Sequence, residues 1–327
     1  MFDIITFGSA TQDIIIKPKK LTLLKYEPHV SSGRQVTFPT GTKINIEDIK
    51  FLSGGGGTNT AATFALQGLK TAYCGVIGND IAGKQIVAEL KGLKVNTSLV
   101  QITKEKATNH SIVISSPDED KTVFAYRGAA ELMGSDQVPW KKLKARWLYL
   151  APLSGLLCDT FEEIVGFAKN QGMKVAANPG TTQLALHNFE DIVKRVDILF
   201  LNQEEASFLT KIAYEQEKEI FKKIQEMHGG ITVMTKGGEG VVVSDGQYLY
   251  SAVPPANRVV VDTTGAGDSF ASGFLSEYIR GGGNIESAVQ FGMGNSVANL
   301  AIMGAKTGLL KKGQPFERVE VKKELII

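Results

Sequence analysis

The chain has 327 residues, 43% of them hydrophobic, which suffices for one large α/β domain or two small ones. Its net charge of +2 and its scattered short lysine groups argue against nucleic acid or another polyanion as a partner. Only two cysteines, no apolar run of membrane-spanning length and no basic leader at Met1 predict a cytoplasmic protein without membrane contact.

Short apolar stretches alternate with helical patterns along most of the chain. The predicted strands are Ile4–Gly8, Thr71–Gly75, Trp147–Ala151, Lys174–Ala177, Ile198–Leu201, Ile231–Thr235 and Gly240–Val243. The predicted helices are Thr58–Gly68, Lys84–Leu90, Thr160–Lys169, Glu204–Leu209 and Tyr214–Met227. This alternation predicts an α/β protein with a mostly parallel central sheet and helices on both faces. Ligands are expected beyond the carboxyl ends of the strands.

Two segments, 13–50 and 108–127, interrupt the alternation with β-rich stretches and polar turns. Their predicted strands are Ile14–Lys17, Gln35–Phe38 and Lys43–Ile49 in the first segment, and the hairpin Ser111–Ser115 with Thr122–Tyr126, joined through 117–120, in the second. Because two separated segments share this character, they are expected to form a small β-structure that projects from the α/β body.

The most informative segment is Asp262-Thr263-Thr264-Gly265-Ala266-Gly267-Asp268. The β-branched run Val259–Val261 before it predicts the end of a strand, and Phe270 and Phe274 after it begin a helical pattern. A tight turn at a helix N-terminus offers unpaired N–H groups to an anion. A carboxylate there repels an anion unless it has a chemical task, so Asp268 is a candidate base for a hydroxyl that attacks a phosphoryl group. The structural alternative is an ordinary acid in the first turn of a helix.

Two common phosphate-binding motifs do not explain this turn. The Gly-x-x-x-x-Gly-Lys-Ser/Thr pattern of a Walker A loop occurs nowhere in the chain. The dinucleotide fingerprint Gly-x-Gly-x-x-Gly fails because Phe270 occupies the place of its third glycine. The absence of that fingerprint also argues against a dinucleotide-dependent dehydrogenase.

Four motifs resemble those of the ribokinase-like (PfkB) family of carbohydrate kinases. The turn at 262–268 resembles the C-terminal signature of the family, and Ser53–Ala62 followed by Gly75–Asp80 resembles its N-terminal signature. Asn202-Gln203-Glu204-Glu205 matches its Asn-x-x-Glu element, and Thr235–Gly240 lies where the family has a nucleotide-binding turn. Order and spacing agree from Ile4 to Gly308. The resemblance implies a single ribokinase-like domain over 1–327, with 13–50 and 108–127 forming a lid over the substrate.

The resemblance also implies roles for individual residues. Asp268 would be the base, and Gly265, Ala266 and Gly267 would offer N–H groups to the transferred phosphoryl group. ATP and Mg²⁺ would be held by Asn202, Glu205, Thr235, Gly237 and Gly240, with Glu205 reaching the metal through water and Asn295 and Asn299 at the edge of the adenine. Asp262 and Thr264 resemble a monovalent-cation site, as in potassium-activated members, although turn and capping bonds explain them equally well.

On the substrate side, the resemblance implies that Asp13 binds sugar hydroxyls and that Gly55, Gly56, Asn59 and Arg127 line the same pocket. Gly56 stands where many ribokinases carry a lysine, which makes a phosphorylated sugar a less suitable substrate. The sequence therefore predicts a kinase that phosphorylates a primary hydroxyl of a sugar, with a homodimer formed through the lid.

Two other functions remain open at this point. A nucleoside kinase could use the same machinery, with the lid aromatics Tyr26 and Phe38 stacking on the base. A non-catalytic sugar-binding or regulatory protein could share the fold. The intact turn with Asp268 argues against the second of these, because a protein that only binds its ligand needs no base.

Overall fold

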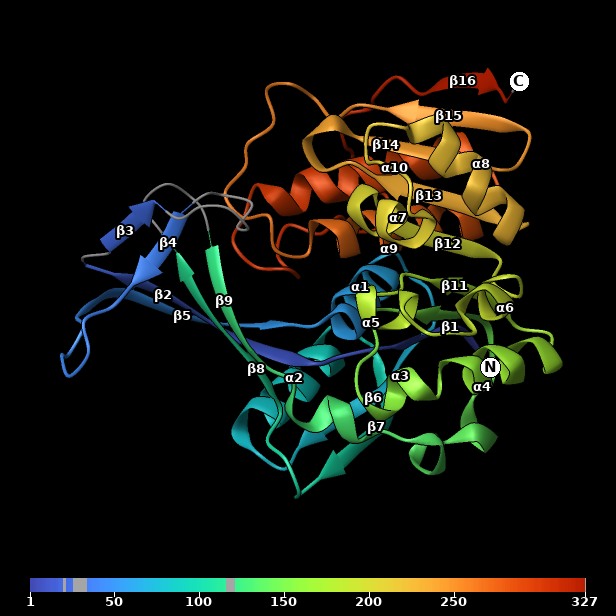
Figure 1. The fold of residues 1–327 in the computed structure, drawn as a ribbon. Helices are drawn as coiled ribbons and strands as arrows, with labels where there is room; N and C mark the ends of the chain where they lie inside the picture. Colours follow the sequence, from blue (N-terminus) through green and yellow to red (C-terminus); the bar gives the residue numbers. More distant parts are fainter. Residues whose placement is uncertain (20–21, 26–33, 116–120, 327) are drawn as a thin grey trace.

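Figure 1 shows a computed structural model of the chain, which describes residues 1–19, 22–25, 34–115 and 121–326. A 10-stranded sheet forms its centre. The strands are β1 (Phe2–Phe7), β6 (Thr71–Gly78), β7 (Asn96–Thr103), β10 (Ala145–Leu150), β11 (Lys174–Ala177), β12 (Ile198–Asn202), β13 (Ile231–Thr235), β14 (Val241–Ser244), β15 (Tyr248–Ala252) and β16 (Lys322–Leu325). They lie side by side in the order β7-β6-β1-β10-β11-β12-β13-β14-β15-β16.

The strands from β7 to β13 are parallel, and β14, β15 and β16 extend the sheet in antiparallel fashion. This confirms the mostly parallel sheet that the alternating pattern predicts. The strand β1 lies between β6 and β10, so the chain first builds the sheet on one side of β1 and later continues on the other. Such a reversal leaves a crevice at the carboxyl ends of the strands, where α/β proteins bind ligands.

Helices cover both faces of this sheet. One face carries α1 (Gly56–Leu66), α2 (Ile81–Gly92), α9 (Ala266–Arg280) and α10 (Ile285–Leu300). The other face carries α3 (Leu156–Asp159), α4 (Phe161–Asn170), α5 (Thr181–Leu184), α6 (Phe189–Val193), α7 (Gln203–Thr210) and α8 (Glu217–Met227). The core under α9 is aromatic: the ring of Phe274 lies 5.7 Å from that of Phe200 and 6.1 Å from that of Tyr278.

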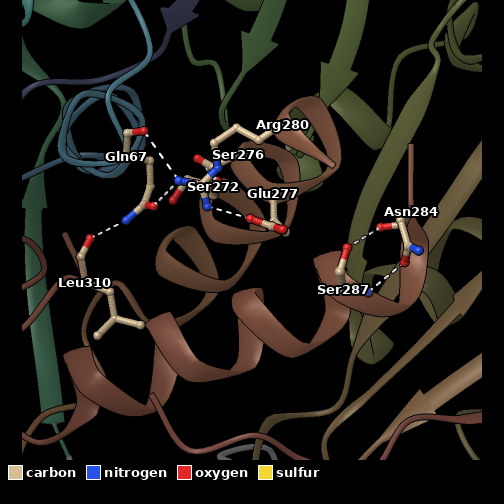
Figure 2. Close-up of polar contacts among 8 residues, drawn as sticks. All are labelled: Gln67, Ser272, Ser276, Glu277, Arg280, Asn284, Ser287 and Leu310. Carbon is tan, nitrogen blue, oxygen red and sulfur yellow. Dashed lines mark hydrogen bonds and ion pairs between the residues drawn. The ribbon is translucent and has the colours of Figure 1, made fainter. Parts of the chain in front are cut away.

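A partly buried polar contact joins the helices that carry the site residues (Figure 2). Arg280 at the end of α9 donates to the side chain of Gln67, just after α1, at 2.6 Å, and it also pairs with Glu277. The Gln67 amide in turn donates to the carbonyl of Leu310 at 2.5 Å. These bonds fix α1, α9 and the segment after α10 against one another, far from the carboxyl ends of the strands.

A second sheet projects away from the α/β body (Figure 1). Its strands lie in the order β5 (Ile46–Gly54), β2 (Thr11–Pro18), β8 (Asn109–Ser115) and β9 (Lys121–Tyr126). Both β-rich segments of the sequence contribute to it, and the pair β3 (Thr22–Lys25) and β4 (Arg34–Thr37) lies beyond its far end. The predicted turn at 117–120 lies outside the described residues.

Several predicted elements differ from the structure. The run Val259–Val261 is not a strand: it pairs with none of the described strands, and Val261 donates to the carbonyl of Leu300 at the end of α10. The strand predicted at Lys43–Ile49 instead continues to Gly54 and enters α1 almost directly. None of the helices in the described ranges has the length and apolarity that crossing a membrane requires.

Candidate active site

The glycine-rich turn between β5 and α1 lies directly on the carboxyl end of β1. A Cβ atom on Gly57 would come within 2.8 Å of the Tyr73 ring and 2.9 Å of Gly8, so only glycine permits this approach. Thr6 of β1 donates to the Gly57 carbonyl at 2.9 Å. Gly55 has φ +99°, a left-handed conformation that favours glycine. The sequence of this turn therefore places the N-terminus of α1 at the crevice beside β1.

Asp268, in the first turn of α9, faces this glycine-rich turn. Its Oδ2 accepts a hydrogen bond from Asn59 Nδ2 at 2.8 Å, and its Oδ1 lies 3.5 Å from the position that a Cβ on Gly56 would take. Burial raises the pKa of the Asp268 carboxyl, while the bond from Asn59 and the charge of Lys306 lower it. A half-buried carboxylate held at one oxygen, with the other directed to a glycine, suits a base that accepts a proton from a bound hydroxyl.

Asn59 is itself almost fully buried, and its Oδ1 has no hydrogen-bond partner among the described residues. A buried amide oxygen without a partner is costly, by about 1–3 kcal/mol. A hydroxyl bound beside Asp268 could donate to this oxygen. The amide thus orients the base on one side and offers an acceptor on the other.

Asp13 lies on β2 beside the same glycines. A Cβ on Gly54 would lie 2.2 Å from Asp13 Oδ2, so glycine leaves the space that the carboxylate occupies. Burial raises the pKa of Asp13, and its bond to Ser111 and the charge of Lys306 lower it. The structure thus brings Asp13, Gly55, Gly56, Asn59 and Asp268 to one place.

The turn before α9 is held by Asp262. Its Oδ1 accepts from the Thr264 N–H at 3.0 Å and from the Thr264 hydroxyl at 2.7 Å, and its Oδ2 accepts from the Gly304 N–H at 2.9 Å. Gly265 has φ +78°, and a Cβ there would lie 2.5 Å from Ala305 Cβ. The Ala266 N–H donates to the Thr263 carbonyl at 3.2 Å, so this amide is already engaged and does not point freely to an anion, contrary to the prediction.

A cavity of about 350 Å³ opens on the other side of this turn. Predicted nucleotide and turn residues line part of it: Thr235, Gly237, Gly240, Ala266 and Gly267. The remainder of its wall is mainly apolar and includes Phe270, Met293, Val297 and Leu300. An apolar cavity with a helix N-terminus at its edge suits a planar base attached to phosphates.

Asn295 and Asn299 do not line this cavity, which corrects the prediction that they border the adenine. Both side chains are fully buried. Asn295 bonds to the Ser269 carbonyl and the Leu310 N–H, and Asn299 donates to the Gly304 and Thr307 carbonyls. Their helical spacing is real, but they face the segment after α10, and the residues of this helix that line the cavity are Met293, Ser296, Val297 and Leu300.

Asn202 and Glu205 form a reciprocal cap at the start of α7. Asn202 Oδ1 accepts from the Glu205 N–H at 2.7 Å, and Glu205 Oε2 accepts from the Asn202 N–H at 2.8 Å. Burial raises the pKa of Glu205. Asn202 pairs in register with Thr235 of the cavity wall. Within the described part of the chain, no three acidic, His or Cys side chains converge as a metal site. The second Glu205 oxygen fits an Mg²⁺ held through water and nucleotide phosphates.

The lid residues proposed for substrate contact are less closely gathered. Arg127 directly follows β9 and is exposed. Phe38 follows β4 and is 37% exposed, and Tyr26 lies outside the described residues.

Sequence reasoning missed Lys306, in the segment after α10. Its side chain is only 4% exposed, although lysine is rarely buried. The Gly304-Ala305-Lys306 stretch carries no pattern that distinguishes it from any surface turn, so only its position in the fold reveals it.

Comparison with known proteins finds a matching family and related kinases. The family model described as "pfkB family carbohydrate kinase" matches residues 1–311. The chain is 28% identical to the cytidine kinase of Thermococcus kodakarensis, over 90% of this chain and 94% of that protein. It is 26% identical to the ribokinase of Haemophilus influenzae, over 89% of this chain and 95% of that protein.

Among solved structures, that of Arabidopsis thaliana ribokinase complexed with ribose and ATP superposes with a TM-score of 0.77 at 23% identity, over 95% of this chain and 96% of that one. This likeness confirms the fold, while the family model covers both signature turns and the residues between them. With Asp268 and the glycine-rich turns in place, the chain belongs to the pfkB family of carbohydrate kinases and is a phosphotransferase.

Proposed function

We propose that the protein transfers the γ-phosphate of ATP to a primary hydroxyl of a sugar, with Asp268 as the base. The observation that carries this proposal is the 2.8 Å bond from Asn59 to Asp268, which holds a half-buried carboxylate beside Gly56. The substrate hydroxyl lies between Asp268 and the incoming phosphate. Asp268 takes its proton as the oxygen attacks phosphorus, and the N-terminus of α9 stabilises the charge that develops.

The nucleotide occupies the cavity on the far side of the turn before α9. Its base lies against the apolar wall, and its phosphates approach Gly267 and the Thr235–Gly240 turn. Glu205, with Asn202 beside it, would hold Mg²⁺ through water, and the ion would neutralise phosphate charge. Asp262 and Thr264 hold the turn in shape, and a monovalent cation at this point would share the oxygens that already serve those bonds.

Asp13, Gly55, Gly56 and Asn59 bind the substrate, and Arg127 contacts it when the projecting sheet lies over the pocket. We regard residues 1–327 as a single domain whose segments 13–50 and 108–127 act as a lid that excludes water from the transfer. Cys74 and Cys158 are both free and buried, as suits a protein of the reducing cytoplasm.

A nucleoside is the second candidate substrate, because relatives named as a cytidine kinase and a nucleoside kinase match most of this chain. An assay of ADP release with Mg-ATP across sugars, sugar acids and nucleosides decides between the two. Turnover of a sugar supports the first proposal, and turnover of nucleosides alone supports the second. Binding without turnover of any member would leave only the non-catalytic function.

We expect Asp13→Asn to raise the KM for the phosphate acceptor. An amide keeps the shape of the side chain but loses the charge that strengthens its bonds to hydroxyls, which is worth about 1.5–3 kcal/mol or some 10- to 100-fold in KM. Steady-state kinetics with the preferred acceptor measures this. Asp48→Asn, an exposed acid on the neighbouring strand β5, is the control and should leave KM unchanged. Equal KM values in both variants would remove Asp13 from the pocket.

We further propose a homodimer through the projecting sheet. On the face opposite Asp13, strand pairing aligns Phe51, Ile14, Ile112 and Phe124 in one row. The rings of Phe51 and Phe124 are 60% and 56% exposed, and a contiguous apolar patch of this kind commonly marks an interface.

Light scattering after size exclusion is expected to give twice the 35.3 kDa chain mass for the wild type and the single mass for Phe124→Lys. Leu325→Lys, an equally exposed apolar residue at the edge of β16, is the control and should remain dimeric. A monomeric wild type at micromolar concentration would contradict the proposal.

A further inference from the structure

Lys306 is a buried cation fastened to two elements that border the substrate side. Its Nζ lies 2.6 Å from Ser53 Oγ, at the end of β5, and 3.4 Å from Glu89 Oε2, on α2. Ser53 also donates to Glu89, which closes a three-membered cluster. Only 4% of the Lys306 side chain is exposed, whereas Glu89 is 39% exposed. The ammonium is thus fixed in position by the protein itself.

Its bond to Ser53 holds the Lys306 ammonium close to the residues of the substrate side. The next residue, Gly54, packs against the Asp13 carboxylate, and Gly56 faces Asp268. The charge of Lys306 acts on both carboxylates, and both act on Lys306 in return.

Two carboxylates that share a pocket disfavour each other's ionised form, and withdrawal from water disfavours both. Burial raises the pKa of Asp13 and of Asp268, yet each must be ionised to accept hydrogen bonds or a proton from a hydroxyl. A neutral sugar or nucleoside brings no cation with it and displaces water when it binds. The compensating charge must therefore come from the protein or from a bound ion.

We propose that Lys306 is a positioning residue of the transfer reaction: its ammonium, fixed by Ser53 and Glu89, is the internal counter-ion shared by Asp13 and Asp268, and it keeps both carboxylates charged in the closed pocket. This proposal rests on the proposed function, because it assigns Asp13 to the acceptor and Asp268 to the base.

Other charged or titratable groups act on this set. They are Glu89 on α2, Asp262 before α9, and Tyr149 on β10, which is fully buried near Asp268 and Glu205. Glu89, Asp262 and Glu205 are acidic, so among these neighbours Lys306 supplies the positive charge. Burial lowers the pKa of Lys306, while Glu89, Asp13 and Asp268 raise it and favour its charged form.

Two variants test whether Lys306 acts as a counter-ion or only forms a structural tie, holding β5 and α2 together. Lys306→Met keeps the length of the side chain but removes the charge, and Glu89→Gln breaks the same cluster but leaves the charge of Lys306 less neutralised. A structural tie predicts that both variants lower activity equally at every pH. A counter-ion predicts that the two variants do not shift the acid limb of the pH profile in the same direction. The acid limb of kcat/KM moves to higher pH by about one pH unit in Lys306→Met, and stays or moves to lower pH in Glu89→Gln. Lys306→Arg should keep the wild-type profile.

The same variants are tested without any substrate by ¹³C NMR of aspartate carboxyl groups, with Asp13→Asn and Asp268→Asn assigning the two signals. Both signals should titrate at higher pH in Lys306→Met than in the wild type. This readout separates the two proposals: absent turnover with shifted titrations would overturn the kinase function but keep the counter-ion. Unshifted titrations in Lys306→Met, or equal profiles for Lys306→Met and Glu89→Gln, would overturn the counter-ion.

Discussion

Replacing Asp268 with Asn is expected to lower kcat by about a thousandfold, because general-base catalysis typically contributes 10²- to 10⁴-fold. The amide has nearly the same shape as the carboxylate but cannot accept the proton of the acceptor hydroxyl. The fold should tolerate the change. Asn59 carries both a donor, now bonded to Asp268, and an oxygen without a partner in the described chain, so either orientation of the new amide can be bonded.

The measurement is ADP release on the best acceptor, with the melting temperature and ATP binding recorded on the same preparations. Glu286→Gln is the matched control, because Glu286 is an exposed acid in the first turn of the neighbouring helix α10. It has only the structural role that a first-turn acid can have, worth about 0.3–1 kcal/mol. If Asp268→Asn reduced kcat no more than Glu286→Gln does, Asp268 would be an ordinary helix-terminal acid and the mechanism would fail.

The ionisation of the Asp268 carboxylate also determines how the activity of the wild type changes with pH. Burial raises the pKa of Asp268 above its ordinary value, and only the ionised form can act as a base. Activity should therefore be present at neutral pH and decline as the pH falls through this raised pKa. The loss begins at higher pH than it would for an exposed aspartate.

Much of the fold could be predicted because its strands are short apolar runs bounded by glycine or polar turns. The ranges of β11 and β13 agree with the prediction at both ends. The strands β7 and β16 were not predicted, because their many polar residues lack the apolar signal, and β15 was not predicted although it is mostly apolar. Val259–Val261 has strand propensity, but among the described residues it pairs with no strand.

In the candidate site too, only some of the residues could be predicted from the sequence. Residues that belong to a local motif, such as Asn59 and Asp268, could be proposed from the sequence, and the structure places them in contact. Residues whose role depends on distant contacts could not. Asn299 shows the correct helical spacing but faces Gly304 and Thr307, and Lys306 acquires its place only because β5 and α2 meet at its side chain.

Gly265→Ala is expected to be the most disruptive single-methyl change in the turn before α9. Gly265 has φ +78°, which costs an alanine about 1–2 kcal/mol, and the new Cβ would lie 2.5 Å from Ala305 Cβ. Relieving this overlap moves the turn or the segment after α10, at a further cost of about 1–3 kcal/mol. Because that displacement shifts the N-terminus of α9, kcat should fall by about 10²- to 10³-fold as well.

Gly267→Ala, two residues away in the same turn, shows what a methyl group does there without backbone strain. No atom lies within 4 Å of the position that its Cβ would take, and its backbone is helical, so the methyl group adds no strain. Replacing a helical glycine with alanine typically stabilises by about 0.5–1 kcal/mol. The methyl group stands at the wall of the cavity that we propose for the nucleotide, so KM for ATP should rise while the melting temperature holds or increases. Thermal unfolding and ATP titration of the two variants measure both effects. Equal melting temperatures for Gly265→Ala and Gly267→Ala would show that the left-handed residue and its contact with Ala305 do not hold the turn, since the strain exists only at Gly265.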